Sequence, residues 1–234
     1  MPNGTVLIHS GGMDSTTLLY DLLDKDHRVR TLSINYGQRH RKELEAAAAI
    51  SKQLGVEHFE ADITAITPLL AGSSQTSEDV AVPEGHYAEE SMKTTVVPNR
   101  NMIMLSIAIG WAVSVDADKV AYAAHAGDHA IYPDCRPEFA VALDKAANLC
   151  HFYPVDIIRP FIAITKADIV RVGNNLGVPY EMTWTCYQGL DIACGRCSTC
   201  VERLEAFDIA NAVDPITYTD TKYWRGVIDA NSNI

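Results

Sequence analysis

A stretch near the amino terminus combines hydroxyl, glycine and carboxylate side chains in the order Ser10-Gly11-Gly12-Met13-Asp14-Ser15. Two consecutive glycines let the backbone turn sharply and approach a ligand closely. Apolar residues before the stretch predict a strand, and the residues after it predict a helix, whose first N–H groups carry a partial positive charge. Because Ser10, Ser15 and Thr16 add hydroxyl donors, this strand–turn–helix junction is suited to binding phosphate. Asp14 either caps the helix or helps to hold Mg²⁺.

This loop differs from the common nucleotide-binding motifs. The chain has no Gly-Lys-Ser/Thr, which excludes a Walker-type loop, and its two glycines do not complete the dinucleotide fingerprint. The pattern Ser-Gly-Gly-x-Asp-Ser resembles the PP-loop of ATP pyrophosphatases, which release pyrophosphate and pass AMP to a substrate oxygen. The resemblance implies catalytic roles for Ser10, Asp14 and Ser15. It also implies contacts with ATP for Ile8, His9, Ser10, Gly11, Gly12, Met13, Asp14, Ser15, Thr16, Thr17 and Leu18. The alternative interpretation is an ordinary glycine turn before a capped helix.

Four cysteines near the carboxyl end form a second group: Cys186, Cys194, Cys197 and Cys200. Two Cys-x-x-Cys steps give short loops that let thiolates converge on one ion. Four sulfur ligands favour tetrahedral Zn²⁺, and a full ligand shell indicates a structural role. The competing interpretation is an iron–sulfur cluster, since the last three cysteines match the start of a ferredoxin-like run. That run, however, expects a fourth cysteine followed by proline, which is missing here.

Apolar runs and helical periodicity predict the elements that position these motifs. Strands are expected at Thr5–His9, Val29–Tyr36, Val56–Asp62 and Lys119–Ala124. Helices are expected at Ser15–Leu23, Arg41–Leu54, Met102–Val115 and Glu138–Asn148, and one more from Thr165, where Thr165 and Asp168 resemble a capping box. The alternation predicts a doubly wound, mainly parallel five-stranded α/β sheet, with ligands beyond its carboxyl edge, where Ser10, Tyr36 and Tyr132 arrive. One domain, 1–234, is expected to include the zinc element 186–200. The segment 64–95 lacks periodicity and is predicted to be a partly mobile lid.

Composition restricts the classes of function. The 234 residues are 47% hydrophobic, as expected for a globular core, and the net charge is −11. Such a negative chain favours small-molecule substrates over nucleic acid. No apolar run approaches the length of a membrane span, and the amino terminus lacks the features of a signal peptide. We therefore expect a cytoplasmic enzyme with reduced cysteines.

Three further stretches narrow the interpretation: Tyr36-Gly37-Gln38-Arg39-His40, Tyr132-Pro133-Asp134-Cys135-Arg136-Pro137-Glu138-Phe139 and Thr185-Cys186-Tyr187. Together with the glycine loop and the cysteines, this ordered set is similar to the 7-cyano-7-deazaguanine synthase family over nearly the whole chain. One departure is Pro98-Asn99-Arg100-Asn101, where the family usually has Pro-Gly-Arg-Asn. Asparagine tolerates left-handed backbone angles, so the turn is expected to survive. Arg100 remains available as a phosphate partner in ATP binding.

The resemblance implies a reaction of queuosine biosynthesis, in which 7-carboxy-7-deazaguanine, ammonia and ATP with Mg²⁺ give the 7-cyano compound, in a homodimeric enzyme. It also implies substrate contacts for Tyr36, Gln38, Arg39, His40, Tyr132, Asp134 and Arg136. We expect the Asp134 carboxylate to accept hydrogen bonds from the base, and Arg136 or Arg39 to face the substrate carboxylate or a phosphate. The alternative for both arginines is that they form ion pairs on the surface. The alternative for His40 is a structural role. Lys166 either reaches a phosphate or lies in solvent; Cys135 has no assigned role.

Three alternatives stay open. An RNA-thiolating PP-loop enzyme would use the same adenylation on a base, although the negative charge of this chain argues against it. A non-catalytic ATP-binding module would bind ATP without releasing pyrophosphate. A relative that applies the same chemistry to a protein carboxylate would share all of these motifs.

Overall fold

A computed structural model describes residues 4–231 of the chain. Five parallel strands form one sheet in the order β3-β2-β1-β4-β5. The strands are β1 (Gly4–Ile8), β2 (Arg28–Asn35), β3 (Glu57–Asp62), β4 (Lys119–Ala121) and β5 (Asp156–Ile158). The chain builds outward from β1 to β3 and then returns to add β4 on the other side of β1. The strand order therefore reverses between β1 and β4.

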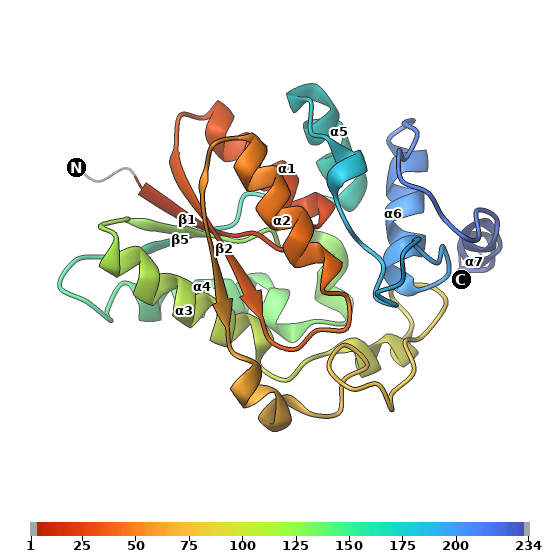
Figure 1. Cartoon of the computed structure of the whole chain (residues 1–234), viewed down its shortest axis with the longest axis horizontal. Helices are drawn as coiled ribbons and strands as arrows, with labels where there is room; N and C mark the ends of the chain where they lie inside the picture. The colour runs from red at the N-terminus through yellow and green to blue at the C-terminus, as the bar shows by residue number, and fades with distance from the viewer. Residues whose placement is uncertain (1–3, 232–234) are drawn as a thin grey trace.

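Helices cover both faces of this sheet (Figure 1). Helices α1 (Met13–Asp24), α2 (Lys42–Gln53) and α5 (Lys166–Leu176) lie on one face, whereas α3 (Arg100–Ser114) and α4 (Pro137–Ala147) lie on the other. Neighbouring residues of β1 point to opposite faces, as a strand requires. Leu7 packs with Leu18 and Ile169, while Val6 packs with Leu105 and Leu143. The predicted doubly wound parallel α/β fold is confirmed.

The carboxyl-terminal part forms a further layer at one end of the sheet (Figure 1). Helix α6 (Ser198–Ile209) packs between α5 and α7 (Tyr223–Asn231). The segment 64–95 contains two 3₁₀ helices, Thr64–Leu70 and Glu90–Thr95, and it reaches this layer. Glu84 there pairs with Cys197 as an isolated bridge, and its carboxylate lies 2.7 Å from the Arg196 guanidinium.

The four predicted strands and five predicted helices are all present, with ends shifted by a few residues. The Thr165–Asp168 capping box at the start of α5 is confirmed. Sequence patterns had not located β5, α6 or α7. Asn99 has the expected left-handed backbone (φ +57°) at the start of α3. Across 4–231, no helix has the combination of length and apolar character that crossing a bilayer requires.

Candidate functional site

A cavity of about 230 Å³ opens at the carboxyl ends of the central strands. Ser10 follows β1, Tyr36 follows β2, and Tyr122 follows β4, and all three line it. Tyr132 joins them, so the residues expected to meet at this edge do meet. The cavity lies where the strand order reverses, which is the usual ligand position in open α/β sheets.

Four helices begin at this cavity. The lining includes Met13 of α1, Arg100 of α3, Lys166 of α5 and Ser198 of α6, and each is the first residue of its helix. Each helix amino terminus presents unpaired N–H groups and a partial positive charge. The arrangement therefore favours a polyanion such as a chain of phosphates.

The glycine loop is held by its own hydroxyls. Ser15 Oγ accepts from the Ser10 N–H at 3.2 Å, lies 3.1 Å from Ser10 Oγ and donates to the Gly12 carbonyl at 3.2 Å. Gly11 has φ +78°, and a Cβ there would collide with the Glu43 carbonyl and Ala47 amide of α2. Glycine is thus required at position 11 by backbone conformation and by the close approach of α2.

The residues predicted to bind ATP fall into two groups. Ile8, Ser10, Gly12, Met13, Asp14, Ser15 and Arg100 line the cavity, whereas His9, Gly11, Thr16, Thr17 and Leu18 do not. His9 is fully buried, with Nε2 3.2 Å from Thr16 Oγ1 and Nδ1 3.3 Å from Ser51 Oγ. Burial lowers the pKa of His9 to about 3, so the ring is neutral at physiological pH. The residues of this second group do not reach the cavity, and His9 instead contacts Thr16 of α1 and Ser51 of α2.

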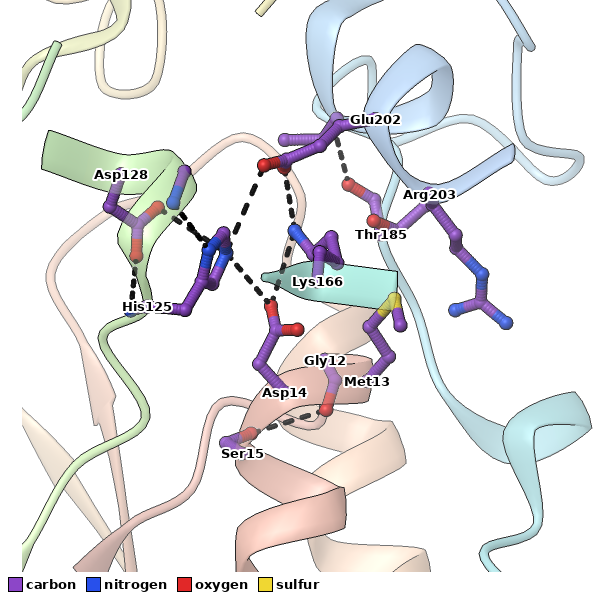
Figure 2. A network of polar contacts seen from close by, with 12 residues as sticks. Gly12, Met13, Asp14, Ser15, His125, Asp128, Lys166, Thr185, Glu202 and Arg203 are labelled. Carbon is purple, nitrogen blue, oxygen red and sulfur yellow. Dashed lines mark hydrogen bonds and ion pairs between the residues drawn. The ribbon is translucent and has the colours of Figure 1, made fainter. Parts of the chain in front are cut away.

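Asp14 and Lys166 form the centre of a polar network (Figure 2). Lys166 Nζ lies 3.2 Å from Asp14 Oδ2 and 2.6 Å from Glu202 Oε2 of α6. Burial alone would lower the pKa of Lys166, but Asp14 and Glu202 raise it well above its usual value. Lys166 does not lie in solvent, and the Asp14 side chain pairs with it rather than capping α1.

His125 completes this network (Figure 2). Its Nδ1 accepts from the Gly127 N–H at 3.1 Å, which places the proton of a neutral ring on Nε2. That nitrogen lies 3.9 Å from Asp14, 3.7 Å from Asp128 and 3.8 Å from Glu202. Three carboxylates therefore surround one ammonium and one imidazole beside the glycine loop.

The other side of the cavity is aromatic. Tyr36, Tyr132 and Tyr187 line it together with Arg100, whose guanidinium lies 5.9 Å from the centre of the Tyr132 ring. Burial raises the pKa of Tyr36 to about 12. Burial alone would lower the pKa of Arg100, whereas the phenols of Tyr36, Tyr187 and Tyr132 raise it well above its usual value.

The stretch Tyr36–His40 turns the chain away from β2. Gln38 accepts from the Tyr36 N–H at 2.9 Å and donates to Glu43 Oε1 at 3.0 Å, so it braces the turn from outside the cavity lining. Arg39 also lies outside the lining and donates to the Ser77 and Val80 carbonyls. His40 lines the cavity, with Nε2 3.3 Å from Glu43 Oε2.

Asp134 and Arg136 do not line the cavity. Asp134 Oδ2 accepts from the Asn101 backbone N–H at 3.0 Å and thus anchors the start of α3. Arg136 is exposed and donates to the His129 carbonyl at 2.9 Å. Cys135 does line the cavity, and burial raises the pKa of its thiol well above the usual value, which keeps it protonated.

The four cysteines meet as predicted. Their Sγ atoms all lie within 4.8 Å of one another, with Cys197 and Cys200 3.4 Å apart and Cys194 and Cys200 3.9 Å apart. Tetrahedral zinc with Zn–S bonds of about 2.3 Å separates its sulfurs by about 3.8 Å, so the quartet fits one ion. Backbone N–H groups donate to Cys186 Sγ and Cys194 Sγ, as around metal-bound thiolates.

Several lining residues escaped the sequence analysis. Glu43, Asp128 and Glu202 are single carboxylates on separate elements, and only the fold brings them to the cavity. Tyr187 did carry a signal, because it belongs to the stretch Thr185–Tyr187.

The fold and the site define the class of protein, a doubly wound α/β fold with a PP-loop-like glycine loop at the carboxyl ends of its strands. Two solved structures share this fold at low sequence identity. A 4-thiouridine synthetase–RNA complex with bound ATP aligns with a TM-score of 0.52 and 15% identity, over 99% of this chain and 50% of that one. NMN synthetase from Francisella tularensis aligns with a TM-score of 0.51 and 14% identity, over 99% of this chain and 84% of that one.

Sequence similarity identifies the family. The family model described as "Queuosine biosynthesis protein QueC" matches residues 4–211. A 7-cyano-7-deazaguanine synthase of Hahella chejuensis is 56% identical over 93% of this chain and 94% of its own length. One of Pseudoalteromonas atlantica is 55% identical over 93% of this chain and 100% of its own length. The chain belongs to this family, as its sequence motifs predicted.

Proposed function

We propose that the chain is an ATP-dependent ligase that converts 7-carboxy-7-deazaguanine and ammonia into 7-cyano-7-deazaguanine, releasing AMP and pyrophosphate. Family membership is the observation that carries this proposal, since the relatives bear the name of that product. The cavity supports it, because the helix amino termini beside the glycine loop suit a polyphosphate and the tyrosines suit a flat ring.

The chemistry follows from the substrate. A carboxylate is a poor electrophile, so one of its oxygens attacks the α-phosphorus of ATP and pyrophosphate leaves. Ammonia then displaces AMP and loses a proton, which gives the amide. The amide oxygen attacks the α-phosphorus of a second ATP and pyrophosphate leaves. Loss of AMP and of the two amide protons then gives the nitrile. Positioning and charge stabilisation are the main tasks of the protein.

For the phosphates, the loop offers the Ser10 and Ser15 hydroxyls, and Lys166 lies beside it. Around the loop there are three carboxylates, those of Asp14, Asp128 and Glu202, but one ammonium, that of Lys166. Asp14 Oδ1 is buried without a hydrogen-bond partner. This donor set fits Mg²⁺ that arrives with ATP, and the ion would offset charge on the departing pyrophosphate.

For the base, a carboxylate acceptor suits the ring N–H and the exocyclic amine. Glu43 replaces Asp134 as our candidate, because Glu43 lines the cavity and is held by Gln38 and His40. The cysteine quartet holds structural zinc in this proposal. A cluster is larger than one ion and would not let all four Sγ atoms lie within 4.8 Å of one another, as they do here.

The test is incubation of purified protein with 7-carboxy-7-deazaguanine, ATP, Mg²⁺ and ammonium. Mass spectrometry should detect the nitrile, and chromatography should detect two AMP for each nitrile. Omitting ammonium is the control and should stop nitrile formation. Release of ADP and orthophosphate, or absence of the nitrile, would refute the proposal. Tight, salt-sensitive binding of transfer RNA would favour the RNA-thiolating alternative instead.

A further inference from the structure

The two sides of the cavity differ in how their positive charges are compensated. Lys166 has two carboxylates within 3.2 Å. Arg100 also lines the cavity, yet within residues 4–231 no carboxylate lies within ion-pair distance of it. A partly buried guanidinium without a counter-ion is costly, and an anion bound beside Arg100 would offset that cost.

The surroundings of Arg100 select the shape of that anion. The Tyr36, Tyr132 and Tyr187 side chains line the same part of the cavity, and the guanidinium approaches the Tyr132 ring. Aromatic rings stack on flat heterocycles, and a planar guanidinium binds a planar carboxylate through two parallel hydrogen bonds. A flat ring that carries a carboxylate matches both features.

Arg100 is also held in place. Asn101, the next residue, donates its backbone N–H to Asp134 Oδ2 at 3.0 Å and its side-chain amide to Cys135 Sγ at 3.1 Å. Both acceptors lie within three residues of Tyr132. The start of α3 and the Tyr132 segment therefore move as one unit, which fixes the guanidinium relative to the aromatic wall.

Arg100 enters the cavity from the opposite face of the sheet to the helix that follows the phosphate loop. Helices α1 and α5, which begin at Met13 and Lys166, cover one face of the sheet, whereas α3 covers the other (Figure 1). A triphosphate on the glycine loop would lie near the starts of α1, α5 and α6. Arg100 would then face the molecule that ATP activates.

We propose that Arg100 binds the carboxylate of the substrate, with the heterocycle against Tyr132, and not a phosphate of ATP. This inference rests on the proposed function. It reassigns Arg100 from ATP binding to recognition of the acid, and it makes Asp134 a positioning residue for Arg100. Once the carboxylate has become an amide, the negative charge is gone and the hold of Arg100 weakens.

Calorimetric titration of the intact chain tests the inference. The ligands are 7-carboxy-7-deazaguanine, its uncharged 7-amide and ATP with Mg²⁺, each titrated separately. Arg100→Gln should weaken binding of the carboxylate by about 10- to 100-fold, the loss expected for a charged hydrogen-bonded pair. Binding of the amide and of ATP should change less than about threefold. Arg100→Lys keeps the charge without the planar fork and should give an intermediate loss.

The control is Arg28→Gln, an exposed arginine at the opposite end of β2, which should leave all three affinities unchanged. Circular dichroism and thermal melts check that each variant folds. If Arg100→Gln misfolds, the Arg100→Lys variant serves as the test instead. It should lose more affinity for the carboxylate than for the amide, and equal losses of affinity for the two ligands overturn the proposal. Weakened ATP binding with intact carboxylate binding overturns it too. If the unmutated chain does not bind the carboxylate, the proposed function fails together with this inference.

Discussion

Lys166 Nζ lies 2.6 Å from Glu202 Oε2, a contact that joins the start of α5 to α6. The same ammonium lies 3.2 Å from Asp14 Oδ2 in the first turn of α1. One side chain thus ties together three of the four helices that begin at the cavity. The Lys166 and Glu202 side chains are 10% and 11% exposed, so solvent screens their contact little.

Replacing this ammonium should cost both stability and activity. In Lys166→Met, Asp14 and Glu202 would face each other without a cation, which we expect to lower the free energy of unfolding by about 3 kcal/mol. Urea denaturation measures this loss, and pyrophosphate release should fall in parallel. Lys93→Met, which breaks an exposed pair with Glu90, should cost less than about 1 kcal/mol. Equal urea midpoints for the two variants would contradict a structural role for Lys166.

Ser15→Ala tests the glycine loop. The variant loses the hydroxyl that contacts Ser10 and Gly12, so stability should fall by about 1 kcal/mol. Pyrophosphate release should fall by more than about 100-fold, because that hydroxyl is also a proposed phosphate donor. Ser106→Ala removes an exposed hydroxyl of α3 and serves as the control. Near-normal pyrophosphate release from Ser15→Ala would remove Ser15 from the catalytic assignment.

Removing the metal should disturb the cavity as well as the cysteines. Cys197 precedes α6, and Ser198, Thr199 and Glu202 of that helix line the cavity. Elemental analysis should find about one zinc per chain, lost in Cys197→Ser but kept in Cys150→Ser, whose cysteine is exposed. Loss of zinc should increase hydrogen exchange at the start of α6. Iron and sulfide in the purified protein would contradict the zinc assignment.

The central sheet was predictable because its signals are local. Its buried strands are short apolar runs. The Gly11-Gly12 turn marks the start of α1, and the Thr165–Asp168 capping box marks the start of α5. The last helices lacked such signals. In α6 the charged residues Glu202 and Arg203 are buried where an apolar face would be expected, and their partners Lys166 and Asp214 lie outside the helix.

The candidate site was predictable only in part, for a related reason. The family resemblance singles out the stretch Tyr132–Arg136, and within it chemistry alone favours Asp134 as the ligand contact. The fold instead turns Asp134 toward the start of α3 and leaves Tyr132 in the cavity. Glu43 lies in an ordinary amphipathic helix, where nothing in the sequence distinguishes it from Glu45. Which carboxylate faces a cavity depends on tertiary packing.

The buried His9 should make stability depend on pH. Its pKa is about 3 in the folded chain and about 6.5 when unfolded, so only the unfolded chain takes up a proton between these values. Stability is therefore fully present above about pH 6.5 and is lost as pH falls, by up to about 1.4 kcal/mol per pH unit. Urea titrations between about pH 7 and pH 5 measure the slope. His9→Gln should flatten it and exposed His151→Gln should not; an unchanged slope in His9→Gln would exclude His9 as its source.

The two glycines of the loop should respond very differently to alanine. Gly11 has φ +78°, and a Cβ there would meet the Glu43 carbonyl and come within 2.6 Å of the Ala47 amide, both of them backbone atoms of α2. Gly12 has φ −77°, and its Cβ would lie 3.2 Å from the Ser10 hydroxyl and 3.6 Å, an ordinary contact distance, from the Trp184 carbonyl. Gly11→Ala should therefore lower the free energy of unfolding by about 3 kcal/mol or more, and Gly12→Ala by less than about 1 kcal/mol. Thermal melts of the two variants compare them directly, and similar losses would mean that α2 does not constrain the loop as the backbone contacts indicate.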